Sequence, residues 1–127
     1  MPDQDSKTIL AVVNDIFFQA KISGAAKQAG VTLKYVTTEK DLLEKAGTNP
    51  ALIVFDLNFA AVEPVRLIEK LKSDPTLKQI RLLGYLSHVQ TDLQSAAISA
   101  GCDEVMPRSA FSMNLSHIFG PTGSPAT

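Results

Sequence analysis

The feature that most constrains the fold is an alternation, repeated five times, of a short apolar run with a segment of helical periodicity. Runs of this length are typical of strands, and strands that alternate with helices predict a parallel sheet with helices on both faces. The central run, Ala-Leu-Ile-Val-Phe, is continuous, which indicates a strand buried on both faces. We therefore expect a single doubly wound α/β domain with a five-stranded parallel sheet. Its strands are expected at residues 8–13, 31–36, 51–55, 80–86 and 104–106.

Capping residues and helix breakers place the boundaries of the helices. The first helix is expected over residues 15–29, and Gly30 suits the left-handed residue that closes a helix. Thr38 is the expected N-cap of the second helix, and Pro64 marks the start of the third. The fourth opens at a capping box, Thr91-Asp-Leu-Gln94, with the threonine as N-cap, and Gly101 is expected to end it. The last helix is expected over residues 111–119.

The same periodicity predicts which helix residues are buried. Leu93, Ala97 and Ile98 form the expected inner face of the fourth helix. Phe17 and Phe18 are interpreted as packing residues of the first helix rather than as a stack for a cofactor.

Composition excludes several classes of protein. The 127 residues suit one domain, and a net charge of −1 leaves no footprint for nucleic acid or an anionic membrane. No apolar run approaches the roughly 20 residues that cross a bilayer. A single cysteine, Cys102, excludes an internal disulfide and suits the cytoplasm. We expect a cytoplasmic domain over residues 7–119, with flexible ends at 1–6 and 120–127.

Polar residues gather where the expected strands end. In sheets of this kind the site lies at the carboxyl ends of the strands. Asp15 and Asp56 could supply carboxylates to Mg²⁺, and the backbone carbonyl of Asn58 could supply another oxygen. A carboxylate beside a cation can attack phosphorus, and Arg108 and Ser87 could then hold the transferred oxygens.

Three segments resemble the receiver domain of two-component response regulators: PALIVFDLN, AGCDEVMPRSAF and VVND. The resemblance covers essentially residues 7–119 and implies a flavodoxin-like fold. It makes Asp56 the phosphoacceptor, and Asn58 the residue whose carbonyl binds the metal. It places Arg108 where the family has lysine, and it places Asn14 and Asp15 at the acidic pair. It further implies Mg²⁺ as cofactor, and a histidine kinase or another signalling protein as partner.

The sequence departs from the family pattern at the site. Asn14 replaces one acid, so the metal site loses a charge and any binding of Mg²⁺ is expected to be weak. Counting from Asp56 puts Leu86 at the position of the family's hydroxyl residue, and Ser87 one residue later. Arg108 could bind phosphoryl oxygens, or could form an ion pair with Asp56 that blocks phosphorylation.

Several interpretations stay open for individual residues. Asp15 could instead be the N-cap of the first helix, and Asn14 a turn residue. His88 is interpreted as a loop residue, and Cys102 as a small buried residue.

Three functions follow from these observations. The first is a stand-alone receiver that is phosphorylated on Asp56 and is not an enzyme beyond self-phosphorylation from a phosphodonor. The second is a phosphorylation-independent pseudo-receiver that binds proteins. The third is a small flavodoxin-like enzyme or cofactor binder, which no motif in the sequence supports. Because the chain ends soon after the last helix, any output is expected to act through a partner or a homodimer.

Overall fold

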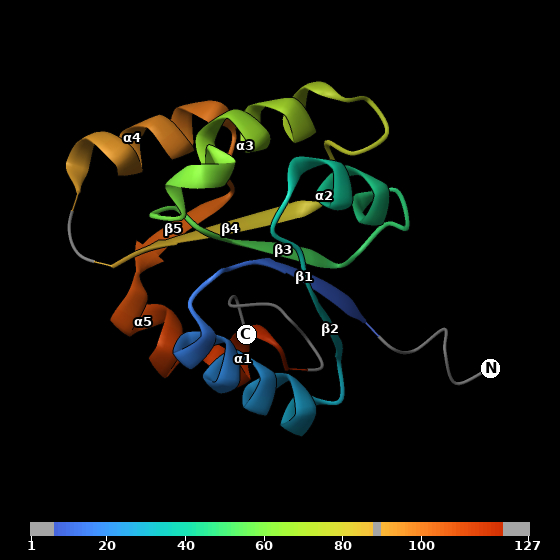
Figure 1. Ribbon diagram of the computed structural model, residues 1–127, viewed down its shortest axis with the longest axis vertical. Helices are drawn as coiled ribbons and strands as arrows, with labels where there is room; N and C mark the ends of the chain where they lie inside the picture. The colour runs from blue at the N-terminus through green and yellow to red at the C-terminus, as the bar shows by residue number, and fades with distance from the viewer. Residues whose placement is uncertain (1–6, 88–89, 121–127) are drawn as a thin grey trace.

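The computed structural model describes residues 7–87 and 90–120 as a sheet covered by helices on both faces (Figure 1). The strands pair in the order β2-β1-β3-β4-β5, and every pair is parallel. This confirms the expected five-stranded, doubly wound sheet with the apolar run 51–55 at its centre. His88 and the expected flexible ends, apart from Gly120, lie outside the described residues. The strands are β1 (Thr8–Val12), β2 (Thr32–Tyr35), β3 (Leu52–Asp56), β4 (Arg81–Leu86) and β5 (Glu104–Pro107).

The helices form one layer on each face of the sheet. In Figure 1, α2, α3 and α4 lie on one side, while α1 and α5 lie on the other. A short 3₁₀ turn, η2 (Ala60–Val62), precedes α3. The helices are α1 (Ile16–Ala29), α2 (Glu39–Ala46), α3 (Pro64–Ser73), α4 (Thr91–Ala100), α5 (Arg108–Met113) and α6 (Leu115–Ile118).

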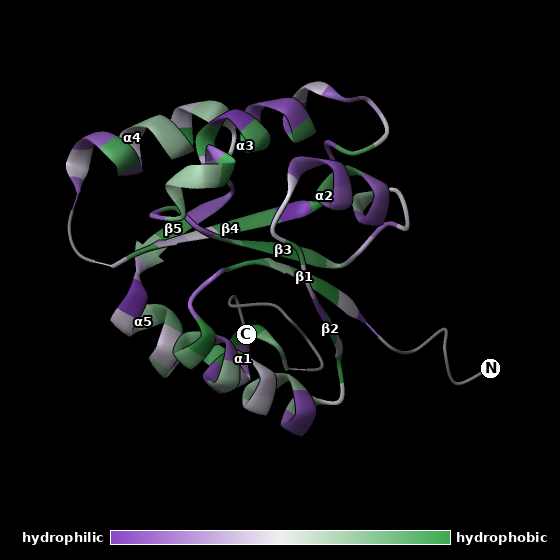
Figure 2. Cartoon of the chain, in the orientation of Figure 1, coloured by the Kyte–Doolittle hydropathy of each residue, from purple (hydrophilic) through white to green (hydrophobic). Residues whose placement is uncertain are grey.

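Each face of the sheet carries its own apolar core. Ile53 and Phe55 point to the α3 side of β3, whereas Leu52 and Val54 point to the α1 side. Figure 2 shows the central strands β1 and β3 as mostly hydrophobic and the helices as a mixture of hydrophobic and polar residues. Strands that are buried on both faces need apolar residues at every position, which explains the continuous runs.

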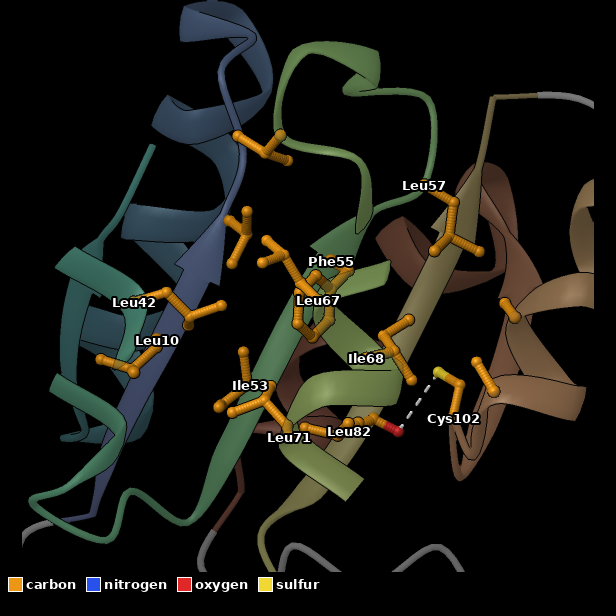
Figure 3. Packing of buried hydrophobic residues seen from close by; sticks show 14 of the residues in the cluster. Leu10, Leu42, Ile53, Phe55, Leu57, Leu67, Ile68, Leu71, Leu82 and Cys102 are labelled. Atoms are coloured by element: carbon orange, nitrogen blue, oxygen red, sulfur yellow. Dashed lines mark hydrogen bonds between the residues drawn. The ribbon is translucent and has the colours of Figure 1, made fainter. Parts of the chain in front are cut away.

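The core under α3 is drawn in Figure 3, where α3 contributes Leu67, Ile68 and Leu71. Cys102 closes this core and is 5% exposed, which confirms the expected small buried residue. Its thiol donates to the Leu82 carbonyl at 3.6 Å, and burial raises its pKa to about 11. Such a thiol stays protonated at neutral pH and is a packing group.

Most of the expected helix boundaries are confirmed. Asp15 and Thr38 are N-caps whose side chains accept backbone N–H groups, and Pro64 is the first residue of α3. Gly30 and Gly101 end their helices with φ of 74° and 113°, a conformation that L side chains rarely adopt. No helix in the described part of the chain is long and apolar enough to span a membrane.

The expectations for the fourth helix are wrong in two respects. Thr91 is already the first helical residue, so Gln90 takes the N-cap position and no side-chain cap forms. Ile98 is 53% exposed, while Ala97 and Ala100 are buried. Successive helix positions lie about 100° apart, so the neighbour of a fully buried residue can face solvent.

Two further differences lie on the other layer. Phe18 is buried, but Phe17 is 84% exposed and does not pack into the core. The last expected helix is split in two at Asn114, and it begins three residues earlier than expected, at Arg108.

Candidate functional site

The candidate site lies at the carboxyl ends of β1 and β3. The chain leaves β1 for β2 on one side and reaches β3 on the other, so the strand order reverses between β1 and β3. Ligand sites of doubly wound sheets form at this switch point. Asp15 follows β1 and Asp56 ends β3, so the fold brings both carboxylates to this edge.

Both oxygens of Asp15 are engaged. Its Oδ1 accepts the backbone N–H groups of Phe17 and Phe18 at 3.0 and 3.2 Å, which caps α1. Its Oδ2 accepts a hydrogen bond from Nη2 of Arg108 at 3.0 Å. The N-cap interpretation is thus confirmed, and the same carboxylate joins α1 to the start of α5.

Arg108 does not form the expected ion pair with Asp56. Among the described residues its ion pair is with Asp15, and its guanidinium lies 4.7 Å from the ring centroid of Phe18. Stacking on Phe18, in the first turn of α1, holds the guanidinium beside the residue that caps this turn. The expectation that Arg108 blocks Asp56 through a direct ion pair is therefore wrong.

Asp56 is half-buried at the end of β3. Its Oδ1 accepts the backbone N–H of Asn58 at 2.9 Å. Burial raises the pKa of Asp56; the bond from Asn58 and the charge of Arg108 lower it, and the charge of Asp15 raises it further. The charges of Asp15 and Arg108 therefore both act on Asp56.

Asn58 connects two loops of the site. Its Oδ1 accepts the backbone N–H of Ser87 at 2.8 Å and the Ser87 hydroxyl at 3.1 Å. Its Nδ2 donates to Oε1 of Gln90, just before α4, at 2.6 Å. Its backbone carbonyl, expected to bind the metal, accepts the N–H of Ala60 at 2.9 Å. Nothing in the sequence assigned Gln90 to the site, because its partner, Asn58, lies in a different loop of the chain.

Leu86 and Ser87, the two candidates for the family's hydroxyl position, lie in different environments. Leu86 ends β4 and is buried in the core beneath α3 and α4. Ser87 is exposed, and its hydroxyl bonds to Asn58. The hydroxyl that was expected to hold a phosphoryl oxygen therefore stabilises the loop instead.

Comparison with known proteins identifies solved structures that share this fold. No protein-family model and no curated protein matches this sequence. Among solved structures, a response regulator from Hahella chejuensis is 18% identical, with a TM-score of 0.80 over 90% of this chain and 92% of that one. The phosphorylated cyanobacterial phytochrome response regulator RcpA is 21% identical, with a TM-score of 0.75 over 90% and 89%.

This chain has the receiver fold. The Mn²⁺-bound form of the response regulator Rcp1 has the same fold, at 16% identity and a TM-score of 0.75 over 88% of this chain and 91% of that one. At these identities the likeness concerns the fold, so the site of this chain has to be judged from its own residues.

The donor set of this receiver fold suits Mg²⁺ poorly. Asn14 is exposed and adds no charge, and both oxygens of Asp15 already accept hydrogen bonds. Within residues 7–87 and 90–120, no three His, Cys, Asp or Glu side chains gather closely enough to hold a metal ion. Mg²⁺ needs oxygen ligands in near-octahedral geometry, and Asp56 alone offers little towards it.

Tyr85 is a neighbour of the site that the sequence did not reveal. It is the register partner of Asp56 on the adjacent strand. Its ring stacks on Phe111 with centroids 4.9 Å apart and lies 5.2 Å from the ring of Phe18. The hydroxyl is buried without a hydrogen-bond partner in the described part of the chain, and burial raises its pKa. Its place in the expected strand 80–86 is compatible with burial, but only the strand register places it beside Asp56.

Two open pockets flank the site. One, of about 530 Å³, is mostly apolar and lies between η2, α3 and α4, with Leu57 and Leu93 among its walls. The other, of about 400 Å³, lies between α1, α5 and the end of β4. Its lining residues are Phe18, Lys21, Ser87, Arg108, Ser109 and Ser112.

Proposed function

We propose that this chain is a receiver-like signalling module that acts through protein partners and works without phosphorylation of Asp56. The ion pair between Arg108 and Asp15 is the observation that carries this proposal. Transfer of a phosphoryl group to a carboxylate requires cations that neutralise the incoming charge. Here Arg108, the cation whose charge acts on Asp56, is directed to Asp15 rather than to Asp56, and Asn14 leaves the site one acid short of the family's metal-binding set.

The partner in this proposal is another protein of a signalling pathway, or a second copy of the chain. The receiver fold of the structural neighbours, all described as response regulators, supports a role in signalling. We choose a protein as the partner because the net charge of −1 favours neither nucleic acid nor a membrane. We place this activity in the cytoplasm, as the single cysteine suggests.

Phosphorylation on Asp56 is a second candidate function, and a specific observation favours it. Asp56 ends the central strand, and only one of its oxygens accepts a hydrogen bond from a described residue. The other oxygen is thus available as a nucleophile. Arg108, with five N–H donors, could bind phosphoryl oxygens while it keeps its contact with Asp15.

Labelling with a phosphodonor tests both functions. The wild-type protein is incubated with acetyl phosphate and Mg²⁺, and intact mass spectrometry measures any added phosphoryl group. We expect no labelling of the wild type. The double variant Asn14→Asp/Arg108→Lys is expected to label, because it restores an acid for the metal and replaces the forked guanidinium with a compact charge.

Asp56→Asn in the double-variant background is the control, and it should abolish the label. Full labelling of the wild type, at the rate of the double variant, would show that this is an ordinary phosphoacceptor. If neither protein labels while both remain folded, the phosphorylation-independent function stands.

A further inference from the structure

The pocket between α1 and α5 has the chemistry of an anion site. Lys21 and Arg108 bring positive charge to it, and three serines bring hydroxyl groups. Among the described residues, no acidic side chain lines it. Its volume of about 400 Å³ lies within the range of small-molecule sites, about 300–1,000 Å³.

Several of these polar groups are available to a ligand. In the part of the chain that the structure describes, Lys21, Ser109 and Ser112 have neither a hydrogen bond nor an ion pair from their side chains. Arg108 uses one nitrogen on Asp15 and keeps other N–H donors. Polar groups without partners, gathered in one hollow, favour a ligand that accepts several hydrogen bonds.

Asp15 pairs with Arg108, but the helices around the pocket bring no further acid. Helices α1, α5 and α6 contain no Asp or Glu, and they carry Lys21, Lys27 and Arg108. Asp15, just before α1, is committed to Arg108 and to the cap of α1. Asp56 lies on the same side of the sheet, next to Tyr85, but does not line the pocket.

We propose that this pocket binds a phosphate monoester. A monoester dianion offers three terminal oxygens, which match an ammonium, a guanidinium fork and serine hydroxyls. Phe18, which also lines the pocket, gives the organic part of the ester an apolar contact. The site requires no metal, and it goes beyond the proposed function because it does not depend on any reaction of Asp56.

Phenyl phosphate is the probe, and NMR titration in buffer containing EDTA is the measurement. Phenyl phosphate, unlike acetyl phosphate, does not transfer its phosphoryl group readily, so phosphorylation of Asp56 does not interfere with the titration. We expect saturable shifts of the backbone amides of Lys21, Ser109 and Ser112. Absence of saturation in the wild type would overturn the proposal.

The chain offers a matched control for charge. Lys21 and Lys27 lie on the same helix, but only Lys21 lines the pocket. Lys21→Gln should weaken binding about 10-fold, since it removes a charge-assisted hydrogen bond, whereas Lys27→Gln should leave it within about two-fold. Equal losses in the two variants would overturn the site, because they would mean unspecific attraction by the helix.

Two further arms separate this site from Asp56 and identify the source of the ester. Asp56→Asn removes a negative charge outside the pocket, so it should bind phenyl phosphate at least as tightly as the wild type; a loss would show that binding needs the Asp56 carboxylate and would overturn the proposal. A short phosphoserine peptide is titrated in parallel. Tighter binding of the peptide would identify a phosphorylated protein as the source, and tighter binding of phenyl phosphate a small metabolite.

Discussion

The carboxylate of Asp15 serves two purposes, and a pair of variants separates them. Asp15→Ala removes both the cap of α1 and the ion pair with Arg108, so we expect it to lower the free energy of unfolding by about 1–2 kcal/mol. Asp15→Asn keeps an oxygen for the cap. Its expected cost is below about 0.5 kcal/mol, because a half-exposed ion pair contributes little. Urea unfolding measures both, and equal losses would mean that the cap contributes nothing.

Burial of Asp56 makes stability depend on pH in a defined direction. Its pKa is raised in the folded protein, so the native state holds this proton more tightly than the unfolded chain does. The resulting stabilisation is complete below the unfolded pKa, near 3.8, and is lost as the pH rises through the folded pKa. Asp56→Asn, which cannot ionise, should therefore be more stable than the wild type at neutral pH.

The measurement is urea unfolding of both proteins over a pH series. The difference in unfolding free energy should shrink towards zero in acid. A difference that stays constant from acid to neutral pH would show that the variant acts through packing instead.

The residues around these carboxylates show what sequence reasoning can reach. The cap by Asp15 follows from contacts within three residues, so it was predictable. The partner of Arg108 was not, because a long side chain with five donors can reach either of two carboxylates. Its choice depends on the ring of Phe18, which only the packing of α5 against α1 brings into place.

Among the elements, the loop after β3 and the start of α4 are joined by the side chain of Asn58. Asn58→Ala removes its bonds to Ser87 and Gln90, and we expect a loss of about 1 kcal/mol. The loss should concentrate in the first turn of α4, which has no side-chain cap of its own. Hydrogen exchange of the amides in this turn should accelerate.

A local readout distinguishes this connection from general destabilisation. Amides in α2, whose Glu39 bonds to Arg66 and Lys70 rather than to Asn58, serve as the internal control and should keep their exchange rates. Equal acceleration in α2 and α4 would contradict a specific link through Asn58.

The helices also show why the sequence predicted their boundaries better than their buried faces. Glycine and proline act on the backbone of a few residues, and their effects at Gly30, Pro64 and Gly101 are independent of the fold. The exposure of Ile98 and Phe17 depends instead on how each helix is rotated against the sheet. Apolar spacing alone leaves this rotation open, because more than one stripe of α1 is apolar.

At the scale of the whole molecule, the sheet divides the interior into two separate cores. Phe119, after α6, is fully buried in the core beneath α1. Phe119→Ala should lower the free energy of unfolding by about 3–5 kcal/mol, because it leaves a large cavity. Met113→Ala is the matched control, since Met113 is 83% exposed and should cost less than about 0.5 kcal/mol. Thermal unfolding compares the two; a mild effect of Phe119→Ala would mean that the last helix is dispensable.

The position of Tyr85 gives the protein an optical reporter of its own site. The chain has no tryptophan and two tyrosines, so its intrinsic emission comes from Tyr35 and Tyr85. Tyr35→Phe would leave a single emitter, packed between Phe18 and Phe111 and paired in register with Asp56. Because a carboxylate close to a phenol quenches its emission, a change in the charge of Asp56 should alter the emission of Tyr85 and be readable in a fluorimeter without any attached dye.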